Sequence, residues 1–269
     1  MAEESGKTMK VALCSIAFRE RLLEYSLDLA CEAGIDGVEI WGREPHISEE
    51  YDANRVAAAR KMVEDRGLEV AVFGSYLRLG AVETDSMPLR DTLQIATGLD
   101  VGMVRVWAGD IGSDEADDDL WKRTVSECRD AACAAEKMGL QLAVEMHTNT
   151  LADTASSAKR LVEDVGRDNF GLNYQPLPSL EDDPVKRLKH VLPYVSHFHA
   201  QNYAALNGDP GKIERASLAE GVIDFMPLVS LLQDNGYDGY LAVEFSPSNV
   251  EDKRAAVLRD CIYLQNIKD

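Results

Sequence analysis

The chain has 269 residues, of which 45% are hydrophobic, and a formal net charge of -19 at pH 7. This length and composition allow a sizeable core, whereas the negative charge argues against nucleic-acid backbones and anionic membranes as partners. The leader MAEESGKTMK lacks the pattern of a signal peptide and no run of about eighteen apolar residues occurs, so we expect a cytoplasmic protein that begins with a flexible leader at 1–9.

In chain order, short Val/Ile/Leu-rich runs alternate with longer amphipathic runs, which is typical of βα units around a parallel sheet. The predicted strands are KVALCSI, GVEIW, LEVAVFG, GMVRVW, LQLAVEM, FGLNYQ, YVSHFHA and GYLAVEF. The predicted helices lie near 21–33, 49–66, 87–99, 119–138, 154–165, 183–191, 224–235 and 250–266. Eight such units without a Pro/Gly/Ser-rich linker predict one α/β domain at 10–269, a (β/α)₈ TIM barrel.

Glycine follows several of the predicted helices, in EAGIDG, DRGLEV, KMGLQL and DNGYDG. A glycine at this position takes the left-handed conformation that ends a helix and turns the chain toward the next strand. The stretch 201–223 is the one long segment of mixed character. Because long loops in compact domains are often functional, we expect this segment to contribute to a site.

Side chains of a barrel strand point alternately to the barrel axis and to the helices. The uniformly apolar set should face the helices, so the polar set faces the axis: Glu39, Arg105, Trp107, Glu145, His147, Asn173, Gln175, His197, His199, Glu244 and Ser246. The tetrapeptide LAVE occurs twice and ends at Glu145 and at Glu244. Both carboxylates close strands at the C-terminal mouth, where barrel enzymes place their chemistry.

Several carboxylates in one restricted mouth repel one another and resist ionisation unless a cation offsets them. We therefore expect one divalent metal ion, Mn²⁺, Mg²⁺ or Zn²⁺. No Gly-rich phosphate loop or dinucleotide fingerprint occurs, so no nucleotide cofactor is expected. The five cysteines lack a CxxC pair and fall mostly within apolar segments, which argues against a disulfide framework and a zinc knuckle.

The segments EAGIDGVEIWGREPH, VRVWAGD, LAVEMHTNTLADT, SHFHAQN, AEGVIDF and GYLAVEF resemble the sugar phosphate isomerase/epimerase family of xylose isomerase-like TIM barrels. This superfamily also includes endonucleases of the endonuclease IV type. The resemblance implies one divalent metal ion bound by Glu145, Gln175, His199 and Glu244. Gln175 departs from the family, which often has Asp there, and a neutral ligand should lower the affinity for the metal.

The resemblance and the position at the mouth together suggest substrate contacts for Glu39, His46, Trp107, His147, Asn149 and Arg215. His147 and Asn149 would contact sugar hydroxyls or orient Glu145, and Trp107 would stack on a sugar ring. Structural alternatives stay open at this point. They are ion pairs for the glutamates, core packing for His197 and His199, a plain loop for His147 and Asn149, barrel filling for Arg105 and Trp107, a hydrogen bond to substrate for Gln175 and a solvated loop charge for Arg215.

The sequence thus predicts a metal-dependent isomerase or epimerase of a ketose or keto-sugar. Glu145 and Glu244 would exchange the proton through an enediolate. A lyase or dehydratase acting through the same enolate is the alternative, and a non-catalytic sugar-binding barrel is the second alternative. Five histidines and the net charge of -19 argue against the endonuclease branch. We expect a small sugar as the partner, and a homo-oligomer stays open.

Overall fold

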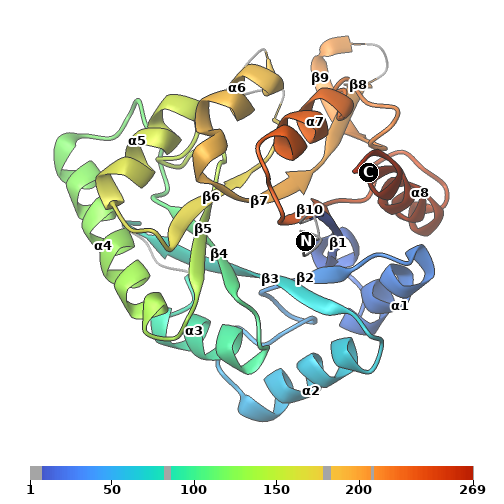
Figure 1. Ribbon diagram of the computed structural model, residues 1–269, viewed down its shortest axis with the longest axis horizontal. Helices are drawn as coiled ribbons and strands as arrows, with labels where there is room; N and C mark the ends of the chain where they lie inside the picture. Colours follow the sequence, from blue (N-terminus) through green and yellow to red (C-terminus); the bar gives the residue numbers. More distant parts are fainter. Residues whose placement is uncertain (1–7, 82–85, 178–182, 207–208, 269) are drawn as a thin grey trace, which may run out of the picture.

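The computed structural model describes residues 8–81, 86–177, 183–206 and 209–268. Eight parallel strands close into a barrel in the order β1-β10-β7-β6-β5-β4-β3-β2, and helices surround it (Figure 1). The barrel strands are β1 (Lys10–Cys14), β2 (Gly37–Trp41), β3 (Glu69–Leu79), β4 (Met103–Ala108), β5 (Gln141–Glu145), β6 (Phe170–Tyr174), β7 (Val195–Ala200) and β10 (Tyr240–Val243). The predicted (β/α)₈ barrel is confirmed.

Every predicted helix has a counterpart among the observed ones. The α-helices are α1 (Leu23–Ala33), α2 (Ala53–Glu64), α3 (Leu89–Gly98), α4 (Asp118–Glu136), α5 (Ala155–Val165), α6 (Pro184–Val191), α7 (Met226–Asp234) and α8 (Lys253–Ile267). Two short 3₁₀ helices, η1 (Ser15–Phe18) and η2 (Leu192–Tyr194), complete the helical elements of the described residues. The glycines expected at helix ends are left-handed, with φ 65° at Gly34 and 71° at Gly236.

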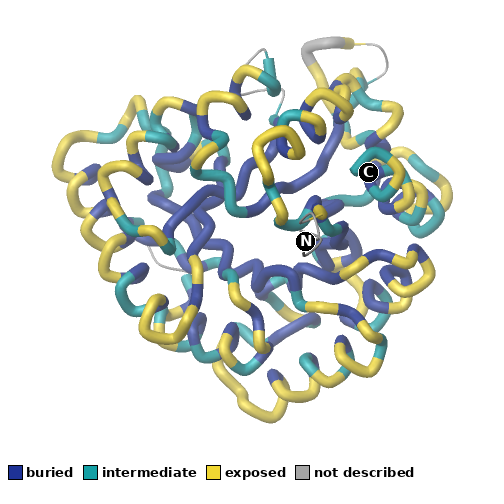
Figure 2. The backbone as a smooth tube through the Cα atoms, in the orientation of Figure 1, coloured by how far each residue is buried: buried dark blue, intermediate teal, exposed yellow. Residues whose placement is uncertain are grey.

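The core lies between the barrel and the helices, where the strands are buried along most of their length (Figure 2). Val38 and Ile40 belong to the apolar set of strand residues that should face the helices, and both are completely buried. Met9, expected in the flexible leader, is only 3% exposed and belongs to this core, whereas residues 1–7 lie outside the described part. No described helix is long and apolar enough to span a membrane.

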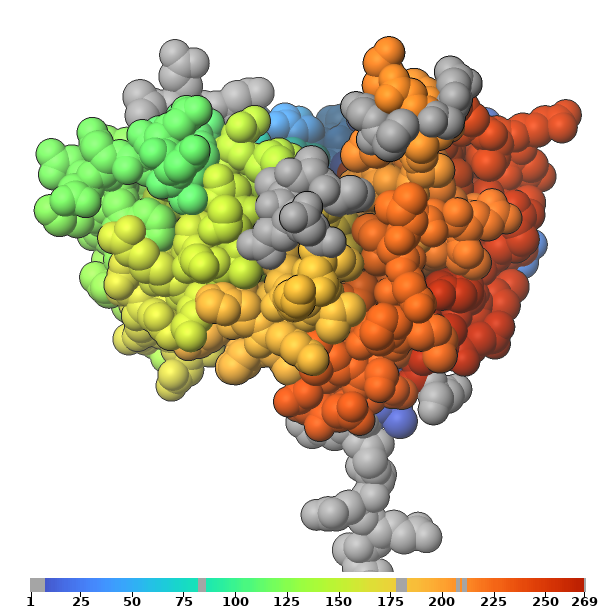
Figure 3. Space-filling view, turned by 90° about the horizontal axis from the view of Figure 1, so that it is seen from above, coloured from blue at the N-terminus to red at the C-terminus, as the bar shows by residue number. Residues whose placement is uncertain are grey.

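Two features differ from the sequence prediction. Strand β3 continues to Leu79, past the predicted end at Gly74, and its extension pairs with β4 beyond a register shift. The stretch expected as a long loop contains an antiparallel hairpin, β8 (Asn202–Leu206) with β9 (Asp209–Ala216). The hairpin, coloured orange, projects at the edge of the molecule in Figure 3.

The root of the hairpin is fixed by buried polar side chains. Asn202 donates from Nδ2 to the carbonyls of Leu218 and Ile223, both at 2.8 Å, and its Oδ1 accepts from the Ile223 N–H at 3.0 Å. Asp260 of α8 accepts from the Leu218 N–H at 2.8 Å. These bonds hold the ends of the hairpin together, so the side chains near its root have a fixed position above the barrel mouth.

Candidate active site

A cavity of about 180 Å³ opens at the C-terminal ends of the barrel strands. It is lined by nine residues singled out from the sequence: Glu39, Arg105, Trp107, Glu145, His147, Gln175, His199, Arg215 and Glu244. A larger cavity of about 560 Å³ lies at the opposite end, beside Gln141 and Tyr240. We assign the chemistry to the smaller cavity because barrel enzymes carry it at the C-terminal mouth and because the carboxylates gather there.

The polar residues stand on a floor of small apolar side chains. Ala12 of β1 and Ala242 of β10 are completely buried and pair in register. Each precedes a residue of the cavity by two positions, Cys14 and Glu244, so that both members of each pair face the barrel axis. The alternation expected from the sequence therefore places the polar layer one step above the barrel floor.

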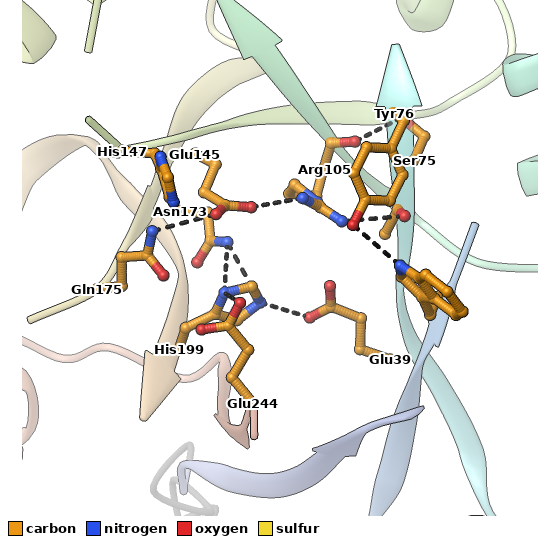
Figure 4. A network of polar contacts seen from close by, with 12 residues as sticks. Glu39, Ser75, Tyr76, Arg105, Glu145, His147, Asn173, Gln175, His199 and Glu244 are labelled. Carbon is orange, nitrogen blue, oxygen red and sulfur yellow. Dashed lines mark hydrogen bonds and ion pairs between the residues drawn. The ribbon is translucent and has the colours of Figure 1, made fainter. Parts of the chain in front are cut away.

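Glu145, at the end of β5, has both carboxylate oxygens engaged (Figure 4). Arg105 of β4 donates from one terminal nitrogen to Glu145 Oε2 at 2.5 Å, and the two side chains are 5% and 3% exposed. The second terminal nitrogen of Arg105 donates to the Gly74 carbonyl at 3.1 Å, which fixes the guanidinium. Gln175 donates from Nε2 to Glu145 Oε1 at 3.1 Å.

The orientation of the Gln175 amide follows from its neighbours. Its Nε2 also donates to the Met146 carbonyl at 2.9 Å, and an amide oxygen in this place would face two acceptors. Its Oε1 accepts from Gln201 Nε2 at 2.7 Å, and Gln201 Oε1 accepts from the hydroxyl of Tyr203 on the hairpin at 2.7 Å. Gln175 is thus a hydrogen-bond donor to the Glu145 carboxylate, with its oxygen already engaged.

His199 of β7 lies between carboxylates on its two edges. Its Nε2 is 2.7 Å from Glu39 Oε2, and its Nδ1 is 3.5 Å from Glu244 Oε1. Glu39 Oε2 also forms a hydrogen bond with His197 Nε2 at 2.9 Å. Asn173 Nδ2 lies 3.2 Å from the Nδ1 of His199 (Figure 4). The bond to Glu39 favours a proton on Nε2, which leaves the lone pair of a neutral ring on Nδ1.

Burial and neighbouring charges shift the acid–base properties of this group. Burial disfavours the charged form of His199, but attraction by Glu39 and Glu244 outweighs it and raises the pKa of His199 to about 9. Burial would likewise raise the pKa of Glu39, yet the two histidines hold it well below its usual range. Burial raises the pKa of Glu244 to about 7, an effect that His199 partly offsets.

The donor atoms fit a divalent cation. One ligand atom each of Glu145, His199 and Glu244 lies within 4.8 Å of the others, and all three residues are buried. Ligands at 2.0–2.2 Å from one ion are separated by up to about twice that distance, so small adjustments would suffice. The buried Glu244 Oε2 has no hydrogen-bond partner among the described residues, so its lone pairs are available to a ligand.

An aromatic wall closes one side of the cavity. Trp107 stacks on Tyr76 with ring centroids 6.0 Å apart, and the ring of His147 meets Trp107 edge-on at 5.1 Å. The Nδ1 of His147 is 2.9 Å from the Thr148 carbonyl. Since a carbonyl can only accept, Nδ1 carries the proton, and the neutral ring keeps its lone pair on Nε2.

Arg215 lies at the rim of the cavity, with its guanidinium 3.3 Å above the centre of the Phe245 ring. Two expected substrate contacts do not line the cavity. His46 is 5% exposed and bonded to Ser15 Oγ at 2.8 Å and to the Arg21 carbonyl at 3.0 Å, so it connects two loops. Asn149 is exposed and left-handed, with φ 57°, which indicates a turn position.

Sequence reasoning missed four cavity residues that carry a polar group or a thiol: Cys14, Tyr76, Gln201 and Tyr203. Gln201 follows His199 by two positions, so the same alternation, continued by one step, would have found it. Tyr76 lies on the unforeseen extension of β3, and Tyr203 on the unforeseen hairpin. For Cys14 the signal was weak, because a cysteine that ends an apolar strand is most often a packing residue.

Comparisons with known proteins agree with the barrel fold. A model of the xylose isomerase-like TIM barrel family matches residues 27–265. The 3-dehydroshikimate dehydratase of Bacillus anthracis is 24% identical to this chain, and the alignment covers 91% of this chain and 93% of the relative. The crystal structure of a probable 3-DHS dehydratase from the same organism superposes with a TM-score of 0.79 at 20% identity. This superposition covers 96% of this chain and 99% of the other.

Two further structures share the fold. D-psicose 3-epimerase from Clostridium cellulolyticum H10, solved with D-tagatose, gives a TM-score of 0.74 at 19% identity and covers 97% of this chain and 100% of its own. A xylose isomerase-like TIM barrel protein from Mycobacterium smegmatis, solved in complex with magnesium, gives 0.75 at 18% identity and covers 98% of each chain. Since the family model spans most of the sequence, this chain belongs to the xylose isomerase-like TIM barrel family.

Proposed function

We propose that the chain is a metal-dependent dehydratase that removes water from a polyhydroxylated ketone. The observation that carries this proposal is the unequal state of the two glutamates at the mouth. Both oxygens of Glu145 are engaged, by Arg105 and Gln175, whereas Glu244 Oε2 has no partner in the described part of the chain. An epimerase would exchange the proton between two matched glutamates. Glu145 is less suited to this role than Glu244, because both of its oxygens are engaged.

His147 is a second candidate for the base that removes the proton. Its Nδ1 proton is held by the Thr148 carbonyl, and the ring lines the cavity. In the proposed reaction, Nε2 removes the proton on the carbon next to the carbonyl. The C–H electrons form the new double bond, the hydroxyl on the next carbon leaves, and the imidazolium returns the proton to it. One water molecule is lost and His147 recovers its initial state.

Glu145, His199 and Glu244 would hold the metal ion. When bound, a divalent ion supplies Lewis acidity that polarises a carbonyl and favours loss of the neighbouring proton. The other side chains keep this set in place. Glu39 orients the ring of His199 by accepting a hydrogen bond from its Nε2, and Arg105 fixes the position of the Glu145 side chain.

The relatives support enolate chemistry in two forms. The Bacillus anthracis relative is named as a dehydratase, and one structural neighbour as a 3-epimerase. An isomerase or epimerase, the activity expected from the sequence, is therefore the second candidate. The free Oε2 of Glu244 favours it, because this oxygen could serve as a second proton carrier beside His147.

Proton NMR in deuterated water with Mg²⁺ and a panel of cyclic and open-chain polyhydroxylated ketones tests the proposal. Dehydration gives a new olefinic signal that depends on the metal. Deuterium next to the carbonyl without an olefin would instead identify the second candidate. His147→Gln should slow the reaction by about 10²–10⁴-fold while Mg²⁺ binding is kept. The exposed His190→Gln is the matched control and should leave the rate unchanged.

If no ketone of either type exchanges a proton, although the wild type binds Mg²⁺, both candidate functions are wrong. If His147→Gln reacts at the rate of the wild type, the dehydratase mechanism through this residue is wrong.

A further inference from the structure

Cys14 is a buried thiol in the candidate active site that the proposed reaction does not use. It ends β1, is 2% exposed and pairs in register with Glu39 of β2. Its sulfur, one carboxylate oxygen of Glu39 and one ring nitrogen of His199 all lie within 4.8 Å of one another. Thiolate, carboxylate and imidazole are donors that proteins offer to Zn²⁺, whereas Mg²⁺ and Mn²⁺ favour oxygen donors.

A second observation points to a cation at this place. Glu39 is completely buried, and its Oε2 takes the bonds from both His197 and His199. Its Oε1 is buried without a hydrogen-bond partner among the described residues. A buried carboxylate oxygen without a donor is costly, so a ligand that supplies positive charge would relieve it.

We propose that Cys14, Glu39 and His199 form a second site, for a thiophilic divalent ion such as Zn²⁺ or Cd²⁺, and that its occupation excludes an ion held by Glu145, His199 and Glu244. On binding, the S–H bond breaks and the sulfur–metal bond forms. The ring of His199 gives up the proton on the nitrogen that binds the ion, and the released protons pass to solvent. The thiolate and the Glu39 carboxylate together neutralise the charge of the ion.

The exclusion follows from the single lone pair of a neutral imidazole. With the proton on Nε2, as the 2.7 Å bond to Glu39 favours, the lone pair on Nδ1 faces Glu244. To serve the site with Cys14, the ring must carry its proton on Nδ1 and offer Nε2. His199 can therefore complete one donor set or the other.

The two donor sets differ in chemical hardness, so the ion that occupies them affects the proposed activity. The set with two glutamates suits the ions that the proposed reaction needs, while the set with the thiol captures thiophilic ions and removes His199 from the first set. A thiophilic ion should thus inhibit the enzyme by taking over a shared ligand, with no need to contact the substrate.

Cadmium titration followed by ultraviolet absorption tests the second site, because a thiolate bound to Cd²⁺ gives a charge-transfer band. In protein loaded with Mn²⁺, we expect the band to saturate at one Cd²⁺ per chain. One Mn²⁺ should be released for each Cd²⁺ bound, as measured by the paramagnetic resonance of free Mn²⁺. Cys14→Ser and Cys14→Ala should lose the band and keep Mn²⁺ binding. The exposed Cys31→Ser is the matched control and should keep the band.

A band that survives in both Cys14 variants would overturn the site. A wild type that shows the band and retains its Mn²⁺ would overturn the exclusion. The inference uses the metal ligands of the proposed function, but the band needs no substrate and no turnover. The second site can therefore be disproved while dehydration is observed, and it can be supported when no ketone reacts.

Discussion

The buried pair of Arg105 and Glu145 gives the sharpest test of how charge is balanced at the mouth. We predict that Arg105→Met destabilises the metal-free protein by about 3–5 kcal/mol, the usual cost of removing one partner of a buried ion pair. The pair is 2.5 Å apart and almost completely buried. As a general estimate, two unit charges about 4 Å apart attract each other by about 4 kcal/mol at an effective dielectric constant of about 20, which lies within the predicted range.

A divalent ion should rescue the variant, because the ion supplies the positive charge that Arg105 provided. In urea unfolding, Mn²⁺ at about 100 times its Kd adds about 2.7 kcal/mol to the wild type, and we expect a larger gain in Arg105→Met at the same concentration. The double variant Arg105→Met/Glu145→Gln is the control and should show no extra gain. Equal gains in the wild type and Arg105→Met would refute the reasoning.

Two further predictions concern single side chains. We propose that Gln175 acts as a donor to Glu145 and not as a metal ligand. In calorimetry, Gln175→Leu should then reduce the Mn²⁺ affinity less than about tenfold, against a much larger loss for Glu244→Gln. Equal losses would support Gln175 as a ligand. Burial raises the pKa of Asp260 to about 7, so its protonated form stabilises the fold at low pH and stability falls as the pH rises from about 4 to about 7. Asp260→Asn keeps an acceptor for the Leu218 N–H but cannot titrate. The unfolding free energy of this variant should therefore fall less than that of the wild type over this pH range. Parallel pH profiles of the two proteins would contradict the role given to Asp260.

The barrel could be predicted from the sequence because its signals are local and repeated. Apolar runs such as LAVE mark the strands, and left-handed glycines such as Gly34 mark the helix ends. Strict alternation within a strand then determines which side chains face the axis, and this brought Glu145, His199 and Glu244 to one point. The strands, the helix ends and the alternation can each be predicted without knowing which distant segments are in contact.

The parts that escaped prediction depend on long-range contacts. The role of Gln175 is set by Gln201 and by the Met146 carbonyl, which reach it from neighbouring strands. The segment that follows the hairpin of 202–216 is held by Asp260 of the last helix, which accepts from the Leu218 N–H, and no local sequence pattern predicts this contact. His46 resembled a pocket residue, yet its ring bonds to Ser15 and Arg21 of another loop.

A crystal structure of the protein grown with Mn²⁺, with anomalous scattering used to locate the ion, tests the central claim most directly. We predict one strong peak at the C-terminal mouth, within about 2.0–2.3 Å of one donor atom each from Glu145, His199 and Glu244. The same crystals of Glu244→Gln should show a weak peak or none. A fully occupied peak that contacts none of these three residues, or an empty mouth at saturating Mn²⁺, would contradict the account.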